Sequence, residues 1–344
     1  MSRISRHIFA IAAAAATVVA APSHAENSNT AYNFLDIPTS AHVYALGGNN
    51  ITIIDEDVSL SDQNPALIGP ELEKQVEFNY MLYMASGNFA GLRYGMGVGE
   101  HSAFAVGLRY LNYGKFDGYD EFGTPTGAFT PSDLIIEGTY SRDITERWRG
   151  GANLKMAYSS YENYKAFALA ADLGVNYYDP DHDLSFSIML RNMGGQVKRF
   201  TDRYARLPFD IQLGYMQALG RTPLQISITA NNLVRWRIPY YSYSSDGDAL
   251  KIKNGFFTNF FRHLIFGLQY QANEKFYAAL AYNYRVASDM STFGRNILSG
   301  FSLGIGFRVK GFKADIAYAM PHKSGSSLVL NLSYTIPSLI YDEE

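Results

Sequence analysis

Strict alternation of large apolar residues with small or polar ones recurs along most of this chain. In Gly300–Val309, every second residue is large and apolar, and the residues between them are glycine, serine or arginine. Successive side chains of a strand point to opposite faces, so such a strand has one apolar face and one polar or very small face. One strand of this kind fits many all-β folds. Because the alternating pattern recurs along the chain, fewer folds are compatible with it.

Fourteen alternating segments follow one another between residues 75 and 336. Most run about 9–11 residues, the length that a tilted strand needs to cross a membrane. Tyrosines near the strand ends are typical of the aromatic girdles at the two membrane surfaces; we expect Tyr83, Tyr110, Tyr140, Tyr158, Tyr177 and Tyr270 there. The predicted strands are Gln75–Tyr83, Gly87–Val98, Ser102–Asn112, Ser132–Ser141, Arg147–Tyr158, Lys165–Tyr178, Leu184–Asn192, Phe209–Met216, Leu224–Asn232, Arg262–Tyr270, Lys275–Arg285, Asn296–Val309, Phe312–Met320 and Ser327–Ile336.

Short and long connectors alternate between these segments. The long ones are Tyr113–Pro131, Met193–Leu207, Val234–Phe261 and Val286–Arg295. Short turns at one end and long loops at the other are typical of outer-membrane barrels, whose long loops are extracellular. Because lipid offers no water to an open strand edge, the sheet has to close. We therefore predict an all-β fold, a 14-stranded antiparallel transmembrane β-barrel over residues 75–336, with a short tail over 337–344. A soluble protein of several sheets is the alternative.

The first 25 residues have the features of a signal peptide. Arg3 and Arg6 precede an apolar run over Ile8–Ala21, and Ser23-His24-Ala25 fits a cleavage site. The alternative, a membrane anchor, needs about 20 apolar residues, and the run is shorter. The chain has no cysteine, which excludes a lipoprotein anchor, disulfides and thiolate metal sites. Export fits an outer-membrane location.

Residues 26–74 lack the alternation and are too short to form a core of their own. A 14-stranded barrel is wide enough to leave a lumen. We therefore predict that 26–74 fold inward as an N-terminal plug, with one short helix within Asn33–Leu46. Its acids Asp55, Glu56 and Asp57 are expected to meet Lys155 and Arg308 on the lumenal wall. The alternative is a solvated periplasmic turn.

No motif in the chain predicts catalysis, a metal or a cofactor. Asp179–Asp183 lacks the glycine and glutamate that a calcium-binding EF-hand loop requires. No two histidines have ligand spacing, and there is neither a G-x-S-x-G nor an H-E-x-x-H sequence. Acidic residues outnumber basic ones by 32 to 29, so the chain lacks the excess of positive charge that is typical of proteins that bind nucleic acid. We predict that the protein is not an enzyme.

The loop Val234–Phe261 is the best candidate for contact with a partner. Tryptophan, tyrosine and arginine are enriched in binding hot spots. The alternative is that Trp236 and Arg237 belong to the aromatic girdle of the membrane. The candidate residues of this loop are Trp236, Arg237, Tyr240, Tyr241 and Tyr243.

Four runs of the N-terminal region, Asn33–Ala41, Ala45–Asn50, Asp55–Asp57 and Gln63–Leu67, resemble the signature of the PorV/PorQ group of the type IX secretion system. This group is related to the FadL-type fatty-acid transporters, which are 14-stranded barrels with an N-terminal plug. The resemblance therefore implies the same architecture here. The signature residues are Gly47, Gly48, Asn49, Asp55, Asp57, Asn64 and Pro65.

The resemblance, which is closest to PorQ-type members, implies a role as an anchor in the cell-surface attachment complex of Bacteroidetes. Such a barrel would hold a PorZ-like surface protein beside the sortase PorU and PorV, where cargo is joined to anionic lipopolysaccharide. The FadL relationship implies the alternative, a transporter of hydrophobic small molecules. Polar positions expected in the lumen, such as Asp172, Asn176, Asn231 and Arg308, weakly disfavour that alternative. An outer-membrane hydrolase is a third possibility without a motif behind it.

Overall fold

The computed structural model describes residues 30–83, 87–120, 122–200, 204–238, 241–242, 251–252, 255–289, 298–322 and 325–337. The predicted signal peptide and nearly all of the C-terminal tail lie outside these ranges. Within them, no helix has the length and apolar character to cross a membrane.

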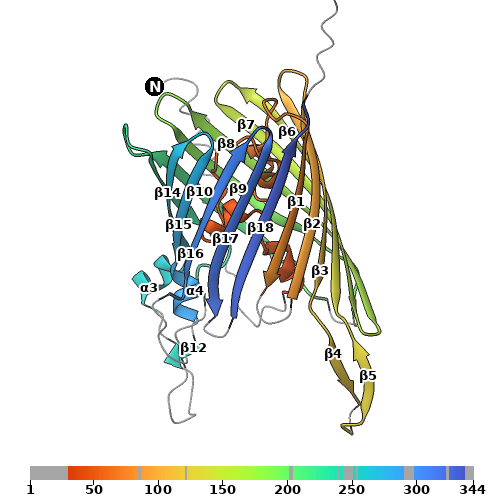
Figure 1. Cartoon of the computed structure of the whole chain (residues 1–344). Helices are drawn as coiled ribbons and strands as arrows, with labels where there is room; N and C mark the ends of the chain where they lie inside the picture. Colours follow the sequence, from red (N-terminus) through yellow and green to blue (C-terminus); the bar gives the residue numbers. More distant parts are fainter. Residues whose placement is uncertain are drawn as a thin grey trace, which may run out of the picture.

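Fourteen antiparallel strands form one closed barrel, which confirms the predicted fold class (Figure 1). The first and last strands close it, with Gln75 opposite Thr335. Each predicted strand corresponds to one barrel strand. They are β1 (Gln75–Tyr83), β2 (Gly87–Val98), β3 (Ser102–Asn112), β6 (Ser132–Thr145), β7 (Trp148–Tyr161), β8 (Tyr164–Asp179), β9 (Leu184–Lys198), β10 (Asp210–Ala218), β11 (Leu224–Ala230), β14 (Leu264–Asn273), β15 (Phe276–Asn283), β16 (Phe301–Val309), β17 (Phe312–His322) and β18 (Gly325–Thr335).

The alternation in the sequence separates the outer surface of the barrel from its lumen. On β16, Leu303, Ile305 and Phe307 are about half exposed on the outside, whereas Ser302 is buried inside. An apolar surface of this extent around a closed barrel is the surface that faces lipid. Tyr83 departs from the girdle prediction, because its ring points inward and stacks on Phe89 at 5.0 Å.

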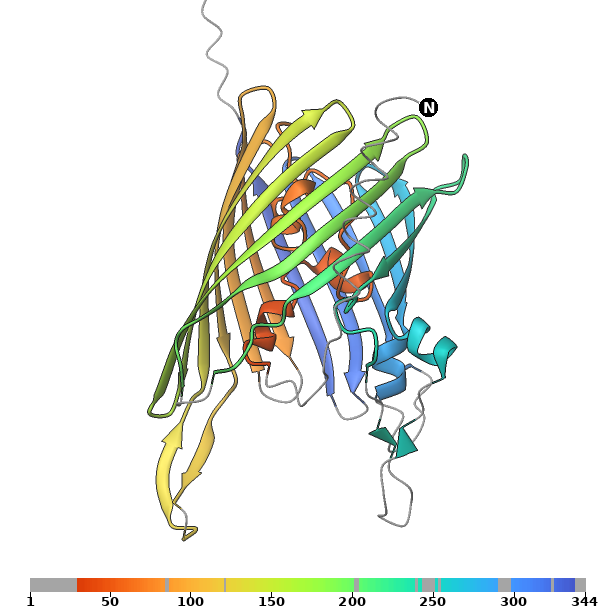
Figure 2. The same ribbon diagram turned by 180° about the vertical axis from the view of Figure 1, so that it is seen from behind.

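The four long connectors lie at one end of the barrel, together with the two-residue turn between β7 and β8, and six short turns lie at the other end (Figures 1 and 2). The long connectors contain structure that the alternation did not predict. Asn283 is one reason, because its side chain accepts a hydrogen bond from Val286 N (3.2 Å) and begins a helix where we expected strand. These additional elements are the hairpin β4 (Phe116–Tyr119) and β5 (Pro125–Phe129), the strand pair β12 (Tyr241–Ser242) and β13 (Lys251–Ile252), and the helices α3 (Phe256–Phe261) and α4 (Tyr284–Asp289).

Residues 30–74, hereafter the lumenal segment, lie inside the barrel (Figures 1 and 2). Helix α2 packs against β15 to β18, η2 against β1 and β2, and η3 against β6 to β8. Side-chain caps begin these short helices: Asp57 accepts from Ser59 N (2.8 Å), and Asn64 accepts from Ala66 N (3.0 Å). The four helices are η1 (Asn33–Asp36), α2 (Ala41–Ala45), η2 (Val58–Asp62) and η3 (Pro65–Leu67).

Candidate functional site

The Asn64-Pro65 turn packs directly against the backbone of the barrel wall. A Cβ built on Gly174 would lie 1.9 Å from Asn64 Oδ1, and one on Gly151 would lie 2.5 Å from the carbonyl carbon of Pro65. Asn64 Nδ2 donates hydrogen bonds to the carbonyl of Ile51 (3.0 Å) and to Ser187 Oγ (3.1 Å). The contact therefore depends on wall residues without a side chain.

The glycine pair of the signature turns the chain after α2. Gly47 and Gly48 have φ of +94° and +82°, which side-chain-bearing residues rarely adopt. Gly47 also lies against β14, where an added Cβ would be 2.3 Å from Ile265 Cγ2. Asn49 follows the pair and is half-buried.

The acids of the lumenal segment bind two cations of neighbouring strands. Asp55 pairs with Arg308 of β16 (2.6 Å) and with Lys313 of β17 (2.6 Å). Lys313 also reaches Asp57, at 2.5 Å. The pairing with Arg308 agrees with our expectation, and Lys313 had not been predicted.

The expected contact with Lys155 is wrong. Lys155 of β7 pairs with Asp172 of β8 at 2.5 Å and donates to Asn192 Oδ1 at 3.2 Å. Glu56 has no ion pair among the described residues, although its backbone carbonyl accepts a hydrogen bond from Gln75. The alternation showed which side chains face inward, but not where around the lumen each one lies.

A second group of buried charges fixes η2 at mid-depth. Arg93 is 2% exposed and pairs with Glu77 (3.3 Å), Glu137 and Asp62 (3.7 Å). Arg109 pairs with the same Glu137 (3.2 Å) and Asp62 (3.7 Å). Two arginines on the wall thus pair with three carboxylates and share two of them, Glu137 and Asp62 of the lumenal segment.

This group of charges was not predicted from the sequence, although a signal was present. Glu77 alternates with Val76 and Phe78 on β1, so it falls on the inward face with Gln75 and Asn79. Charged residues on the inward face of apolar strands require partners. Arg93, the partner of Glu77, lies directly opposite it on the neighbouring strand β2. The remaining partners depend on the path of the lumenal segment and on the order of the strands.

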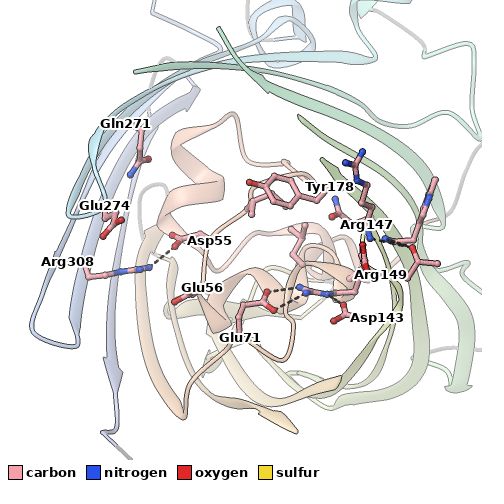
Figure 3. Close-up of a pocket in the computed structure, with 17 residues that line it drawn as sticks. Asp55, Glu56, Glu71, Asp143, Arg147, Arg149, Tyr178, Gln271, Glu274 and Arg308 are labelled. Atoms are coloured by element: carbon pink, nitrogen blue, oxygen red, sulfur yellow. Dashed lines mark hydrogen bonds and ion pairs between the residues drawn. The ribbon is translucent and has the colours of Figure 1, made fainter. Parts of the chain in front are cut away.

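A polar cavity of about 620 Å³ opens at the short-turn end (Figure 3). Glu71 pairs with Arg149 through both oxygens, at 2.7 and 2.9 Å, and Arg149 also reaches Asp143 at 2.6 Å. Figure 3 shows this ion pair and the Asp55–Arg308 pair on different sides of the lumen. The lumenal segment is therefore attached to the wall at two places around this cavity.

The long-loop end of the lumen is apolar. The lining side chains come from strand residues close to the long connectors and pack on Phe34 and Leu35 of the lumenal segment. A small cavity of about 20 Å³ lies beside Phe34. The lining residues, hereafter the apolar compartment, are Met81, Phe89, Leu111, Ile135, Ala157, Ala166 and Ala168.

A continuous series of aromatic rings crosses this compartment. Its rings are Tyr83, Phe89, Tyr113, Tyr161, Phe200, Tyr32 and Phe34, with 5.0–6.3 Å between neighbouring centroids. One buried carboxylate, Asp133, accepts hydrogen bonds from Tyr113 (2.6 Å) and Tyr161 (2.8 Å). The surface offered to a molecule entering here is thus aromatic with few polar groups.

The structure places the loop candidates only in part. Trp236 is 42% exposed and stacks on His263 at 5.1 Å, and Arg237 is exposed. Tyr241 is in β12, whereas Tyr240 and Tyr243 lie outside the described residues. Contact of any of them with a partner remains a prediction. Within the described ranges, no group of three or more His, Cys, Asp or Glu residues is arranged to hold a metal.

The buried imidazole of His42 predicts a dependence on pH. His42 lies on α2, which does not cross the membrane; its ring stacks on Tyr277 at 3.9 Å, and Nε2 lies 2.7 Å from Gln269 Oε1. Burial, assisted by the nearby Lys313, lowers the pKa of His42 from 6.5 to about 4. The released segment then binds the proton more readily than the docked one. Docking should weaken as pH falls from about 6.5 towards 4, by up to about 3 kcal/mol.

Limited proteolysis of residues 30–74 as a function of pH measures this effect. His42→Phe keeps a ring on Tyr277 but removes the titration, so the variant should show a shallower pH dependence than the wild type. Identical slopes for the two proteins would exclude His42 as the source.

No family model and no curated protein matches this chain. Solved structures share its fold. The toluene transporter TbuX of Ralstonia pickettii is 12% identical with a TM-score of 0.57, over 88% of this chain and 100% of that one. The toluene transporter TodX of Pseudomonas putida is 12% identical with a TM-score of 0.54, over 85% and 96%. The monoaromatic hydrocarbon channel CymD is 12% identical with a TM-score of 0.50, over 88% and 98%.

At this level of identity the likeness concerns the fold. The closed barrel and its apolar outer surface define the class of protein: an outer-membrane β-barrel. Within that class it has the fold of these hydrocarbon transporters, with residues 30–74 inside the barrel.

Proposed function

We propose that the protein is a non-enzymatic outer-membrane channel for small hydrophobic molecules, with its long loops extracellular. The observation that carries this proposal is the apolar compartment, which lies at the long-loop end of a barrel shared with toluene transporters. Aromatic and apolar linings with few polar groups are typical of sites for small apolar ligands. The polar residues that weakly disfavoured transport, such as Asp172 and Asn176, are buried on β8, where Asp172 pairs with Lys155.

Passage through this channel requires the lumenal segment to move. The segment fills the compartment and is attached to the wall by Asp55, Asp57 and Glu71. We propose that residues 26–74 act as the plug and that the state described here is closed. A hydrophobic molecule would first displace the packing around Phe34 and then pass the ion pairs.

Filling the compartment should block uptake. Ala168 is 1% exposed and faces the lumen, so Ala168→Trp places an indole where a substrate would pass. We expect uptake of a small aromatic hydrocarbon to fall to the level of cells without the protein. Ala152→Trp on the outer face of β7 is the control and should keep uptake. Because Ala168→Trp also crowds the core, folding is checked by heat-dependent migration in gels; folded barrel with undiminished uptake would contradict the proposal.

A second candidate function is an anchor for a surface protein, as the PorQ-type signature of 33–67 implies. The hairpin β4–β5 favours it, because it extends beyond the barrel at the long-loop end and exposes Tyr119 (62%) and Phe122 (85%) (Figure 1). In this proposal a PorZ-like protein, with PorU and PorV, binds the long loops. Mild detergent extraction should then recover a large surface protein with the wild type and not after deletion of 116–129. Recovery of the barrel alone would count against the anchor.

A further inference from the structure

Five exposed aromatic side chains gather beside the barrel wall at the long-loop end. Their rings are neighbours: Trp236 lies 6.2 Å from Phe256 and 6.5 Å from Phe260, and Phe260 lies 5.7 Å from Phe261. The exposed fractions run from 39% to 74%, although these are large apolar groups. The members, hereafter the aromatic patch, are Trp236, Phe256, Phe257, Phe260 and Phe261.

Buried polar contacts hold the patch in place. Asn259 accepts a hydrogen bond from Ile238 N (3.1 Å) and donates to the carbonyl of Trp236. Arg262 donates to the carbonyl of Ile238 at 2.9 Å, and the ring of His263 stacks on Trp236. Asn259 of α3 thus fixes segment 231–238 together with Arg262 and His263, which follow the helix, and the phenylalanines of α3 point outward. An exposed apolar surface of this kind marks a site of contact with a membrane or with another protein.

The aromatic patch continues the lipid-facing surface of the barrel. Phe261 lies 6.4 Å from Phe266, which shares the outer face of β14 with Leu268 and Tyr270. Figure 1 shows α3 next to the wall at the end of β14 and β15. The same lipid that covers the outer face of β14 can therefore cover the patch without a break.

The two sequence neighbours of Trp236 are arginines. Arg235 and Arg237 are exposed, and in the described part of the chain neither guanidinium has a partner. Arginine binds phosphate oxygens through two parallel hydrogen bonds, and tryptophan prefers the headgroup level of a membrane. Apolar rings and two exposed arginines that adjoin the tryptophan in the sequence match a lipid that carries phosphate above its acyl chains.

We propose that segment 234–238 and α3 form a binding surface for a phosphate-bearing membrane lipid. The aromatic patch lies among the acyl chains, and Arg235 and Arg237 bind the headgroup phosphates. With the long loops extracellular, as proposed above, the lipid is the phosphorylated glycolipid of the outer leaflet. A protein partner on the same surface is the competing outcome of the test.

Tryptophan fluorescence tests the apolar half of the proposal. The chain has two tryptophans, Trp148 and Trp236, so Trp148→Phe leaves a single reporter in the patch. In reconstituted vesicles, we expect lipids brominated near the headgroup end of the acyl chain to quench Trp236 and aqueous iodide to have little effect. Strong quenching by iodide together with no quenching by brominated lipid would overturn the proposal and favour a protein partner.

Lipid binding tests the charged half. Native mass spectrometry compares bisphosphorylated lipid A with its dephosphorylated form. The double variant Arg235→Gln, Arg237→Gln should bind lipid A about tenfold more weakly and lose its preference for phosphate. Arg221→Gln, an exposed arginine of a short turn, is the matched control and should bind as the wild type does. Unchanged lipid A binding by the double variant would overturn the phosphate assignment. Uptake through the lumen is a separate assay, so failure here does not decide the channel function.

Discussion

Replacing Arg93 by methionine is expected to destabilise the folded barrel by about 3–5 kcal/mol, the cost of leaving buried charges without their partner. Arg93 is 2% exposed and contacts Glu77, Glu137 and Asp62. A methionine side chain fills most of the volume of the arginine side chain but carries no positive charge. In the variant, Arg109 still pairs with Glu137 and Asp62. Arg109 has no ion pair with Glu77, so most of the lost stability should come from leaving the carboxylate of Glu77 buried without a partner. Urea unfolding followed by intrinsic fluorescence in vesicles measures the change.

The short turns provide a matched control for this substitution. Arg147 also pairs with two carboxylates, Asp179 (3.3 Å) and Asp181 (2.8 Å), but its side chain is 44% exposed. Exposed ion pairs contribute about 0–1 kcal/mol, so Arg147→Met should change stability little. If both variants lost the same stability, burial would not be what makes the lumenal network important. Adding Glu77→Gln to Arg93→Met should recover part of the loss, because it removes an unpaired carboxylate.

Replacing Gly174 by valine should release the lumenal segment while leaving the barrel closed around it. The new Cβ would lie 1.9 Å from Asn64 Oδ1, so the Asn64-Pro65 turn has to move away from the wall. Overpacking costs about 1–3 kcal/mol, and the hydrogen bonds of Asn64 add about 1 kcal/mol each. Because valine favours strands, the substitution should not weaken β8 itself. We expect faster proteolysis of residues 30–74 and a larger conductance in planar bilayers.

Gly138→Val is the control for this effect. Gly138 also lies in a barrel strand, β6, but nothing stands within 4 Å of a Cβ built on it. This variant should keep the wild-type conductance and the wild-type resistance to protease. Equal conductance for Gly174→Val and the wild type would show that the contact of the Asn64-Pro65 turn with the wall does not close the lumen. Together, the Arg93 and Gly174 results separate the network that stabilises the lumen from the contact that closes it.

Part of the candidate site was predictable. The alternation along the strand placed Arg308 in the lumen, and its pairing with Asp55 is one of the contacts that we expected for the plug. The contact of Asp57 with Lys313 and the role of Arg93 were not predictable, because they depend on which strands stand beside the lumenal segment. The helix α3 was also missed: its four phenylalanines follow no strand period, and its place beside the wall depends on hydrogen bonds to segment 231–238 and on the contact of Phe261 with Phe266.

The sequence by itself determined the fourteen strands, the face of each that meets lipid, and the division into short turns and long connectors. These follow from a two-residue period and from turn residues, which are properties of neighbours in the chain. Only the tertiary structure decided how charges pair inside the lumen, as Lys155 shows by binding Asp172 of the adjacent strand instead of the acids of the lumenal segment. The physical reason is that a charge in the lumen pairs with whatever the closed circle of strands brings within a few ångströms. That distance is set by strand order and by the path of residues 30–74, not by separation along the chain.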